Sequence, residues 1–404
     1  MLTIRKTPDI HPAYDFSQIA PRERIVFFDI ETTGLSASRA GLYLIGAVYF
    51  EAGAWQLVQW FAESVFDEEE MVHAFAGLLS EKRRAAQRDG GKYASVVLVH
   101  YNGDMFDIPF IRRVAQHYRL PDVFTGTVSV DLYKKTKPYK AFLGLPDCKL
   151  KSVERLFGIF RDDRYSGGEL IYVYEEYLRL KNLDDGSCEY NAQNLALREQ
   201  LLETLLLHNA EDLFNLPMIC GVMGFEALFS GRLSFREAEL VRLPGISGAE
   251  ERQVLDLRFS LPEGLPRGMS FEDETYAADL GDILNITAEL CRGELKYFFP
   301  DYKNYYYLPA EDCAVHKSVG EFVDRKARKQ ATARTCYQRK AGVFLPQPEA
   351  VFEPSFYEEY KGKRQYAVYS DSLLTDGGRL SAYAAAVLRH FLARQKDSRS
   401  TAEC

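Results

Sequence analysis

The sequence predicts an α/β protein with a mixed β-sheet flanked by helices, followed by a second, smaller C-terminal α+β unit. Three strand-like segments come first, strand and helix patterns then alternate, and the composition changes near Ser230. Consecutive strands followed by alternating strands and helices favour a mixed sheet with helices on its faces. At 404 residues the chain is long enough for two hydrophobic cores.

The first half of the chain contains the elements of this sheet in order. Apolar or alternating segments predict strands at Arg24–Phe28, Leu42–Phe50, Trp55–Phe61 and Ser95–Tyr101. Apolar residues at helical spacing predict helices at Glu68–Arg84, in the stretch after Asp107 and at Leu195–Leu216. Helices therefore follow the strands in the order that a mixed sheet needs.

Composition changes divide the chain into four expected parts. Residues 1–20 form an N-terminal arm, and residues 21–229 form the first domain. Residues 230–268 are rich in Gly, Pro and charge, and this composition indicates a connecting segment with short structured pieces. Residues 269–404 form an accessory domain, with a disordered tail after Arg394.

The composition also narrows the class of protein. The chain is 47% hydrophobic and 27% charged, and its start has no signal-peptide pattern. We see no apolar run of membrane-spanning length, so no membrane partner and a cytoplasmic location are expected. Seven scattered cysteines without a CxxC pair predict no disulfide partner. A net charge of −8 argues against a general nucleic-acid coat, although local basic patches can still bind phosphate.

The first chemical signal is a pair of acids at the end of the first predicted strand. Asp29 and Glu31 occupy alternate positions after the apolar run, so both side chains project from one face. Two neighbouring carboxylates there are unfavourable unless a cation neutralises them. The pair therefore predicts a metal site.

Two further segments add acids at defined places. Asp107 follows the strand that ends at Tyr101 and heads an amphipathic stretch, in which Pro109 suits the first turn of a helix. Asp212 lies on the long apolar helix with His208 one turn earlier, so both share a face. Taken alone, Asp212 reads as a solvated helix acid and His208 as a core histidine.

The ordered motifs Asp29–Leu35 (DIETTGL), Asn102–Asp107 (NGDMFD) and His208–Asp212 (HNAED) carry a resemblance. This pattern resembles the DEDD superfamily of ribonuclease H-like 3′–5′ exonucleases, and within it the YprB-type ribonuclease H-like family of bacteria. The resemblance runs from about Arg24 to about Cys220. It implies a ribonuclease H-like fold, with the superfamily's four metal-binding acids at Asp29, Glu31, Asp107 and Asp212.

One departure concerns His208. Members with an imidazole at the catalytic position usually place their last Asp five residues later, whereas the spacing here is four, as in the tyrosine-bearing branch. His208 therefore takes the position of that tyrosine.

The chemistry expected of these residues is two-metal hydrolysis of phosphodiesters. Carboxylate oxygens favour Mg²⁺ or Mn²⁺ over zinc, and a pair of such ions lies about 3.5–4 Å apart in these reactions. Our hypothesis is that Asp29 bridges both ions and that Glu31 and Asp212 complete the ion on the nucleophile side. Asp107 binds the other ion partly through water, and His208 orients or deprotonates the attacking water.

Other motif residues have expected substrate roles. By resemblance, the pocket for the terminal nucleotide is lined by Thr32, Thr33, Gly34 and Leu35. Asn102 is a candidate for a phosphate or sugar contact, and Phe106 for stacking on a base. The ordinary alternatives are turn roles for Gly34 and Asn102 and core packing for Phe106.

Basic and aromatic residues supply further candidates. Asp131, Lys149 and Lys151 are candidates to support the site or contact phosphate, the alternative being a solvated basic face. In the C-terminal part, the aromatic run 296–307 and the basic stretch 317–340 suit binding of a single strand. A small tyrosine core beside a solvated basic helix is the alternative.

The leading expectation is a Mg²⁺- or Mn²⁺-dependent 3′–5′ exonuclease that acts on single-stranded DNA or RNA. The alternative is a nucleic-acid-binding or scaffolding protein that keeps the fold with little or no turnover. Four acids disfavour that alternative, because such charges are costly without a metal. An endonuclease is a third option. DNA and RNA both stay open as substrates, because no residue identifies a contact to a 2′-OH, and the sequence predicts no particular oligomeric state, processivity or pathway.

Overall fold

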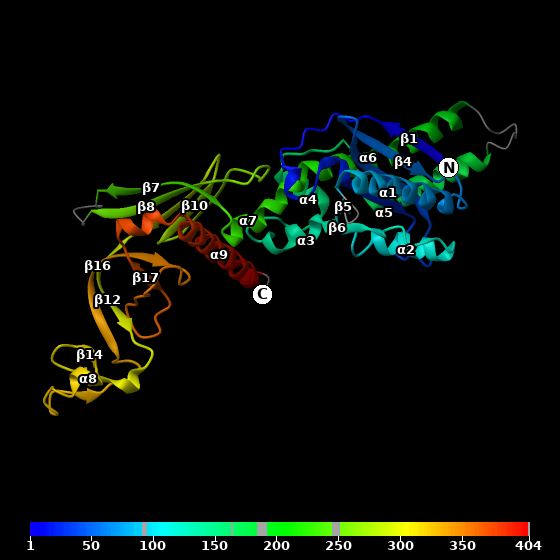
Figure 1. Cartoon of the computed structure of the whole chain (residues 1–404). Coiled ribbons are helices and arrows are strands. Elements are labelled where there is room, and N and C mark those ends of the chain that lie inside the picture. Colours follow the sequence, from blue (N-terminus) through cyan, green and yellow to red (C-terminus); the bar gives the residue numbers. More distant parts are fainter. Residues whose placement is uncertain (91–94, 163–164, 184–191, 245–250, 403–404) are drawn as a thin grey trace. The chain divides into compact units, whose positions relative to one another are not determined.

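The computed structural model describes residues 1–90, 95–162, 165–183, 192–244 and 251–402. The chain forms two compact units, which Figure 1 colours along the sequence. The first unit comprises Met1–Lys140, Gly144–Gly224 and Glu263–Pro266. The second comprises Ala141–Leu143, Phe225–Pro262 and the chain from Arg267 onward. Each unit contains a short segment from the part of the sequence that mainly forms the other unit, so neither unit is one continuous stretch of the chain.

A six-stranded mixed sheet forms the centre of the first unit. Its strands are β1 (Leu2–Lys6), β2 (Ile25–Thr32), β3 (Leu42–Glu51), β4 (Ala54–Phe61), β5 (Val96–His100) and β6 (Thr127–Asp131). The strand order is β1-β4-β3-β2-β5-β6. Neighbours from β1 to β2 are antiparallel, whereas β2, β5 and β6 run parallel. The mixed sheet predicted from the sequence is therefore confirmed.

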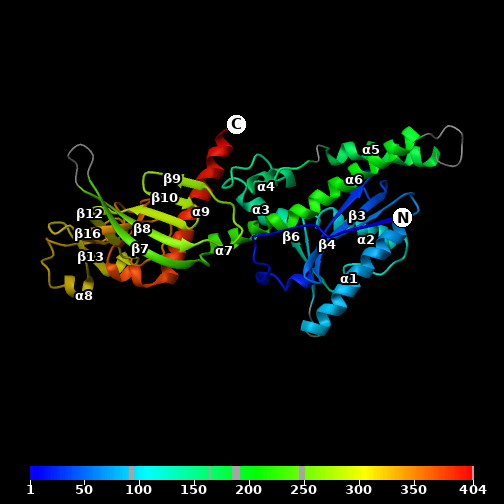
Figure 2. The ribbon, with the colours of Figure 1, turned by 90° about the horizontal axis from the view of Figure 1, so that it is seen from above.

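Helices pack against this sheet, as the top view in Figure 2 shows. They are α1 (Glu68–Gly90), α2 (Asp107–His117), α3 (Leu132–Thr136), α4 (Leu150–Leu156), α5 (Gly167–Leu183) and α6 (Ala192–Ile219). The apolar positions of β2 and β3 are buried almost throughout, because helices cover both faces. Phe28 stacks on Phe75 of α1 with ring centroids 5.4 Å apart. Each such fully buried side chain contributes about 1.5–3 kcal/mol to stability.

Helix α6 crosses the core of the first unit and carries two of the predicted site residues. The stretch Ala192–Ser230 is long and apolar enough to cross a membrane by length and composition, so the expectation that the chain lacks an apolar run of that length is wrong. Of the most apolar 18-residue window in this stretch, 61% is buried inside the protein. The hydropathy of this stretch is therefore accounted for by packing in a protein core.

Three segments differ from the expected division of the chain. The N-terminal arm contributes β1, which pairs with β4 at the edge of the sheet. The expected connecting segment 230–268 instead contains β7 (Ser234–Leu243) and β8 (Arg252–Ser260), whose alternating apolar residues pair across a ladder. The expected tail after Arg394 is helical as far as Ala402, because no Gly or Pro interrupts the helix there. Residues 403–404 lie outside the described chain.

The second unit is built mainly from antiparallel strands. A five-stranded sheet has the order β7-β8-β11-β10-β9, with β9 (Met269–Glu272), β10 (Tyr276–Leu280) and β11 (Leu284–Glu289). A three-stranded sheet contains β12 (Cys291–Phe298), β16 (Tyr337–Gln347) and β17 (Gln365–Val368). A second contains β13 (Tyr305–Leu308), β14 (Cys313–His316) and β15 (Lys329–Gln330). Its helices are α7 (Gly224–Ser230, which starts at the boundary), α8 (Lys317–Gly320) and α9 (Gly377–Ala402).

Many aromatic residues of the second unit contact one another. Phe299 stacks on Tyr305 with ring centroids 4.6 Å apart, and the hydroxyl of Tyr307 donates to Asp312 at 2.5 Å. The Arg328 guanidinium lies 4.5 Å from the centre of the Tyr306 ring. These contacts fit the alternative of a small tyrosine core, but the basic residues lie mostly in turns and short strands, and the predicted basic helix is limited to α8.

Candidate active site

Asp29 and Glu31 lie on β2, in the middle of the sheet of the first unit. Asp29 pairs with Gly46 of β3 in the strand register, and Glu31 pairs with Leu44. Between the two acids, the backbone N–H of Ile30 donates to Asp107 Oδ1 at 3.2 Å. Asp107 is the first residue of α2, so the end of one strand and the start of one helix bring three acids together.

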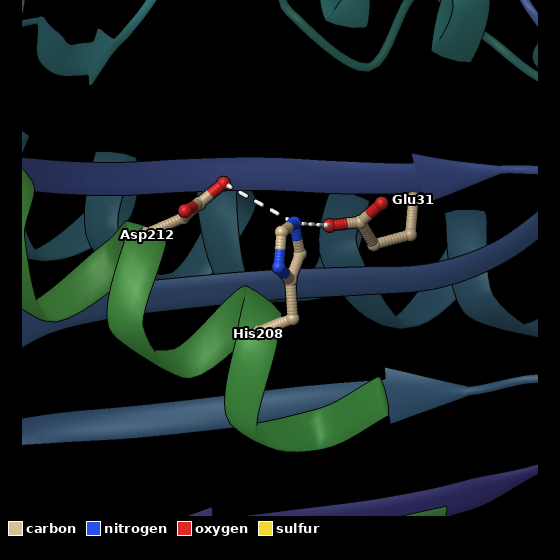
Figure 3. A group of neighbouring side chains, drawn as sticks. All are labelled: Glu31, His208 and Asp212. Carbon is tan, nitrogen blue, oxygen red and sulfur yellow. Dashed lines mark ion pairs between the residues drawn. The ribbon is translucent and has the colours of Figure 1, made fainter. Parts of the chain in front are cut away.

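Helix α6 brings His208 and Asp212 to the same place. His208 Nε2 lies 3.5 Å from Glu31 Oε1 and 4.0 Å from Asp212 Oδ2 (Figure 3). One ligand atom from each of these residues lies within 4.8 Å of the others. Since i and i+4 face one direction on a helix, His208 and Asp212 present their polar atoms together to β2.

The pKa values of two acids reflect this crowding. Burial raises the pKa of Asp29 well above its usual value, and the nearby charges of Asp212, Glu31 and Asp107 raise it further. Burial also raises the pKa of Asp107 to about 7, with added repulsion from Asp131 and Asp212. The site therefore holds protons that ordinary carboxyl groups would release.

The donor atoms suit hard divalent cations. Asp29, Glu31, Asp107 and Asp212 offer carboxylate oxygens, which Mg²⁺ and Mn²⁺ prefer, and the carboxylates repel one another when no cation is bound. His208 adds one imidazole nitrogen at the edge of the group. These residues fit a hard divalent cation in the kind of their donor atoms, and Glu31, His208 and Asp212 also fit one in their mutual proximity.

We expect metal binding to stabilise the protein more as the pH rises. The folded pKa of Asp107 is raised to about 7, so its stabilising contribution is complete below the ordinary carboxyl pKa and is lost as the pH passes about 7. A bound divalent ion compensates the ionised form. Thermal melts between pH 5 and 8 should show that the increase in Tm on replacing EDTA by Mn²⁺ grows with pH.

The control for this pH effect is Asp107→Asn, which removes one titrating group and should flatten the pH dependence. A metal-induced increase in Tm that is equal at every pH would contradict the prediction.

Two polar residues that the sequence reasoning missed hold Asp29 in place. Asn209 Nδ2 donates to Asp29 Oδ2 at 2.8 Å, and Gln59 Nε2 donates to Asn209 Oδ1 at 2.9 Å. Gln59 and Asn209 are both fully buried. Asn209 lies inside the HNAED motif, and this position was the only indication in the sequence that it has a functional role. Gln59 stands in an apolar strand far away in the sequence.

Gly46 allows this network to form. A Cβ atom at position 46 would overlap the side chains of Asn209 and Leu213 on α6. Gly46 pairs with Asp29 in the sheet, so any displacement of α6 there separates Asn209 and Asp212 from the acids of β2.

Gly46→Ala is therefore expected to destabilise the protein by about 1–3 kcal/mol, the usual cost of adding volume to a packed core. The free energy of unfolding in urea measures the effect. The matched control is Gly77→Ala on α1, where the new Cβ meets open space. That change should be neutral or slightly stabilising, because alanine favours helix over glycine. Equal stability of the two variants would contradict the close packing at Gly46.

The segment after Glu31 forms a turn beside the acids. Thr33 Oγ1 accepts from the N–H of Gly41 at 2.8 Å, and Thr32 Oγ1 donates to the carbonyl of Gly34 at 2.9 Å. Gly34 does not have a positive φ, so its backbone adopts a conformation that other residues also allow. The interpretation of Gly34 as an ordinary turn residue is therefore sufficient. Leu35 is 90% exposed. Of these residues, Leu35 is the one with a large apolar side chain directed to solvent.

Asn102 and Phe106 occupy the turn before α2. The N–H of Asn102 donates to Asp131 Oδ1 at 2.8 Å, and φ of Asn102 is 63°, as befits a turn asparagine. A cavity of about 500 Å³ is lined by Tyr101, Asn102, Tyr133, Cys148, Lys149 and Leu150. Phe106 packs against the main core and near Phe110, which supports its packing role. Asn102 and Lys149 thus share a cavity of suitable size for part of a nucleotide.

Asp131 supports the turn. Its Oδ1 also accepts from the N–H of Tyr133 at 3.0 Å and caps α3, while its Oδ2 is buried without a hydrogen-bond partner. This carboxylate lies near enough to Asp107 to raise the pKa of that acid.

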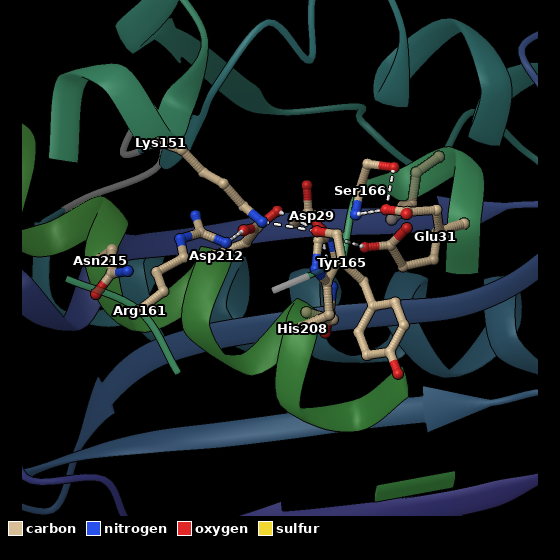
Figure 4. Close-up of polar contacts among 12 residues, drawn as sticks. Asp29, Glu31, Lys151, Arg161, Tyr165, Ser166, His208, Asp212 and Asn215 are labelled. Carbon is tan, nitrogen blue, oxygen red and sulfur yellow. Dashed lines mark hydrogen bonds and ion pairs between the residues drawn. The ribbon is translucent and has the colours of Figure 1, made fainter. Parts of the chain in front are cut away.

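Two cations approach the acids from the segment between β6 and α5. Lys151 Nζ donates to the carbonyl of Tyr165 at 2.7 Å, and in Figure 4 its side chain extends toward the carboxylates. Arg161 forms ion pairs with Asp212 and with Glu154 of α4. Lys151 was expected near the site. Arg161 and Glu154 were missed, because nothing in their local sequence distinguishes them from surface charges.

Comparison with known proteins gives one family match. Residues 26–223 match the model of the RNase_H superfamily. No curated protein matches the chain. The match and the mixed sheet assign a ribonuclease H-like fold to the first unit and support a nuclease of this type.

Several solved structures of exonuclease I also match. One, described as suggesting how processivity is achieved, has 11% identity and a TM-score of 0.25 over 59% of this chain and 55% of that chain. Exonuclease I of E. coli in complex with a dT13 oligonucleotide has 12% identity and a TM-score of 0.25 over 58% and 54%. A product-bound exonuclease I has 12% identity and a TM-score of 0.26 over 59% and 58%. This chain covers little more than half of each, and at these scores the likeness carries no argument about activity.

Proposed function

We propose that this chain, in which residues 26–223 match the RNase_H superfamily, is a divalent-metal-dependent 3′–5′ exonuclease that hydrolyses single-stranded DNA or RNA. One observation carries the proposal. Four carboxylates from three separated segments converge at one point, where burial raises the pKa of Asp29 and the charges of the other three raise it further. Burying such a group costs free energy that a bound divalent cation offsets.

The proposed roles follow from the positions of the residues. Asp29, at the centre of the group and fixed by Asn209, would contact both ions, and Glu31 and Asp212 would hold the ion on the side of the attacking water. Asp107 would hold the other. When bound, the two ions would supply an activated water and charge compensation at the leaving 3′ oxygen.

His208 has the role of proton acceptor in this proposal. Its Nε2 lies between Glu31 and Asp212, where it can orient a water molecule that these carboxylates also contact. Leu35, Thr32, Thr33 and Gly34 border the acids and would receive the terminal nucleotide, with Asn102 and Lys149 contacting the sugar-phosphate chain.

A labelled oligonucleotide tests the proposal. A single strand labelled at its 5′ end should shorten to a ladder of products in Mn²⁺ or Mg²⁺, and EDTA should stop the reaction. A closed circular strand should survive, because it has no 3′ end. Matched DNA and RNA strands identify the preferred sugar.

Other results would favour the alternatives. Binding of the linear strand without any shortening would favour a nucleic-acid-binding or scaffolding protein. Cleavage of the circle would favour an endonuclease.

Two further points belong to the same proposal. We assign the chain to the YprB-type branch on its motifs, with His208 at the position of the catalytic tyrosine. We also propose a cytoplasmic location, for which the scattered cysteines of the sequence are the support.

A further inference from the structure

Arg161 is a buried cation at the edge of the proposed active site. Its side chain is 5% exposed and lies between Glu154, which is 1% exposed, and Asp212, which is 17% exposed. Figure 4 shows the guanidinium group directed at Asp212. A charge this well buried needs partners for its donors, and the arrangement of those partners decides what Arg161 can do.

Glu154 holds two of the three guanidinium nitrogens. Arg161 Nε donates to Glu154 Oε2 at 2.6 Å, and Nη2 donates to Glu154 Oε1. Asn215 Nδ2 also donates to Glu154 Oε1, at 3.0 Å, and so anchors this carboxylate to α6. A bidentate ion pair of this kind fixes the plane of the guanidinium group.

The third nitrogen, Nη1, is the one directed at the acid group, where it donates to Asp212. The Asp212 oxygen that accepts from Nη1 is Oδ1, whereas the oxygen nearer His208 is Oδ2. A divalent cation bound by Asp212 would withdraw charge from the carboxylate and weaken it as the acceptor of Nη1. Because an unpaired buried N–H is costly, Nη1 then needs another acceptor. The phosphate that such a cation binds supplies one, since guanidinium groups match phosphate oxygens in shape and charge.

We propose that Arg161 binds a non-bridging oxygen of the nucleic-acid phosphate at this site, and that Glu154 is the positioning residue that holds it there. This inference rests on the proposed function. In the absence of substrate, Arg161 pairs with Asp212. The other explanation is a structural ion pair that only fixes Asp212.

The test measures binding without turnover. In a His208→Ala background, which keeps the four metal-binding carboxylates, the affinity for a fluorescein-labelled oligothymidylate is measured in Mn²⁺ over a range of KCl concentrations. Adding Arg161→Gln should weaken binding about 10-fold or more. It should also reduce the slope of log K against log salt by about 0.7, the value for one phosphate contact on a single strand. Arg155→Gln, an exposed arginine on α4, is the matched control and should leave the affinity nearly unchanged.

A second measurement separates phosphate binding from a structural role. Calorimetric titration of the otherwise unsubstituted protein with Mn²⁺, without nucleic acid, should show Arg161→Gln binding the ion at least as tightly as the parent, because Arg161 no longer competes for Asp212. Weaker Mn²⁺ binding together with an unchanged salt slope would overturn the proposal in favour of the structural pair.

Removing one member of a buried ion pair is often strongly destabilising, so a second variant keeps the test decisive. Glu154→Gln/Arg161→Gln removes both charges and should show the same loss of affinity and of salt slope, whereas Glu154→Gln alone should weaken binding through misplacement of Arg161. Unchanged affinity and slope in the double variant would overturn the inference and leave the nuclease activity of the parent intact. A parent protein that neither cuts nor binds the oligonucleotide would remove the proposed function as well.

Discussion

Asp29→Asn is expected to lower the rate of hydrolysis by on the order of 1000-fold or more, the loss that follows when several kcal/mol of metal-dependent stabilisation disappear. Burial raises the pKa of Asp29, and the charges of Asp212, Glu31 and Asp107 raise it further, so all three acids lie near it. The substitution keeps the shape of the side chain and removes its charge. Steady-state rates at saturating Mn²⁺ measure the effect.

The matched control is Asp104→Asn. Asp104 belongs to the same motif as Asp107, but its carboxylate pairs with Lys134 at 2.6 Å and accepts from Ser129. Its substitution should change the rate less than a few-fold. Full activity in Asp29→Asn would rule out the assignment of the four acids as the metal site. Thermal melts in EDTA check that both variants fold. Asp29→Asn should leave the metal-free protein at least as stable, because it replaces a buried acid whose pKa is raised by burial and by its acidic neighbours with a group that does not ionise.

His208→Ala is expected to lower the rate by about 100- to 10,000-fold, the usual range for a lost general base. His208 Nε2 lies 3.5 Å from Glu31 Oε1, and no other histidine contributes to this group among the described residues. The steady-state rate at saturating substrate and Mn²⁺ is the measurement.

Two further variants show whether the effect of His208→Ala is specific to the proton acceptor at this position. His208→Tyr places a hydroxyl where the tyrosine-bearing branch has one, and it should recover part of the activity. His73→Ala on α1 removes a histidine that is 58% exposed and should leave the rate unchanged. If His208→Ala kept the full rate, His208 would be a packing residue of α6 and another group would accept the proton.

The strands and the position of the acids could be predicted from local pattern. The apolar run before Asp29 became β2 and the run before Tyr101 became β5. Asp29 and Glu31 lie on β2, Asp107 begins α2, and Asp212 lies within α6. Alternation and helical spacing are local properties, so they survive folding. At residues 230–268, Gly and Pro suggested a connector with short structured pieces, whereas long-range pairing produced the longer strands β7 and β8.

The sequence by itself determined which residues could hold a metal, because carboxylate side chains are metal ligands and the motifs that contain them can be read directly from the sequence. The tertiary structure alone decided how those charges are compensated. Gln59 reaches Asn209 across 150 residues, and Arg161 reaches Asp212 across 51. Neither pair has a local signature, because burial and proximity arise only when β4, α4 and α6 pack around β2. The cost of a buried charge depends on its neighbours in space, and the neighbours in sequence do not specify it.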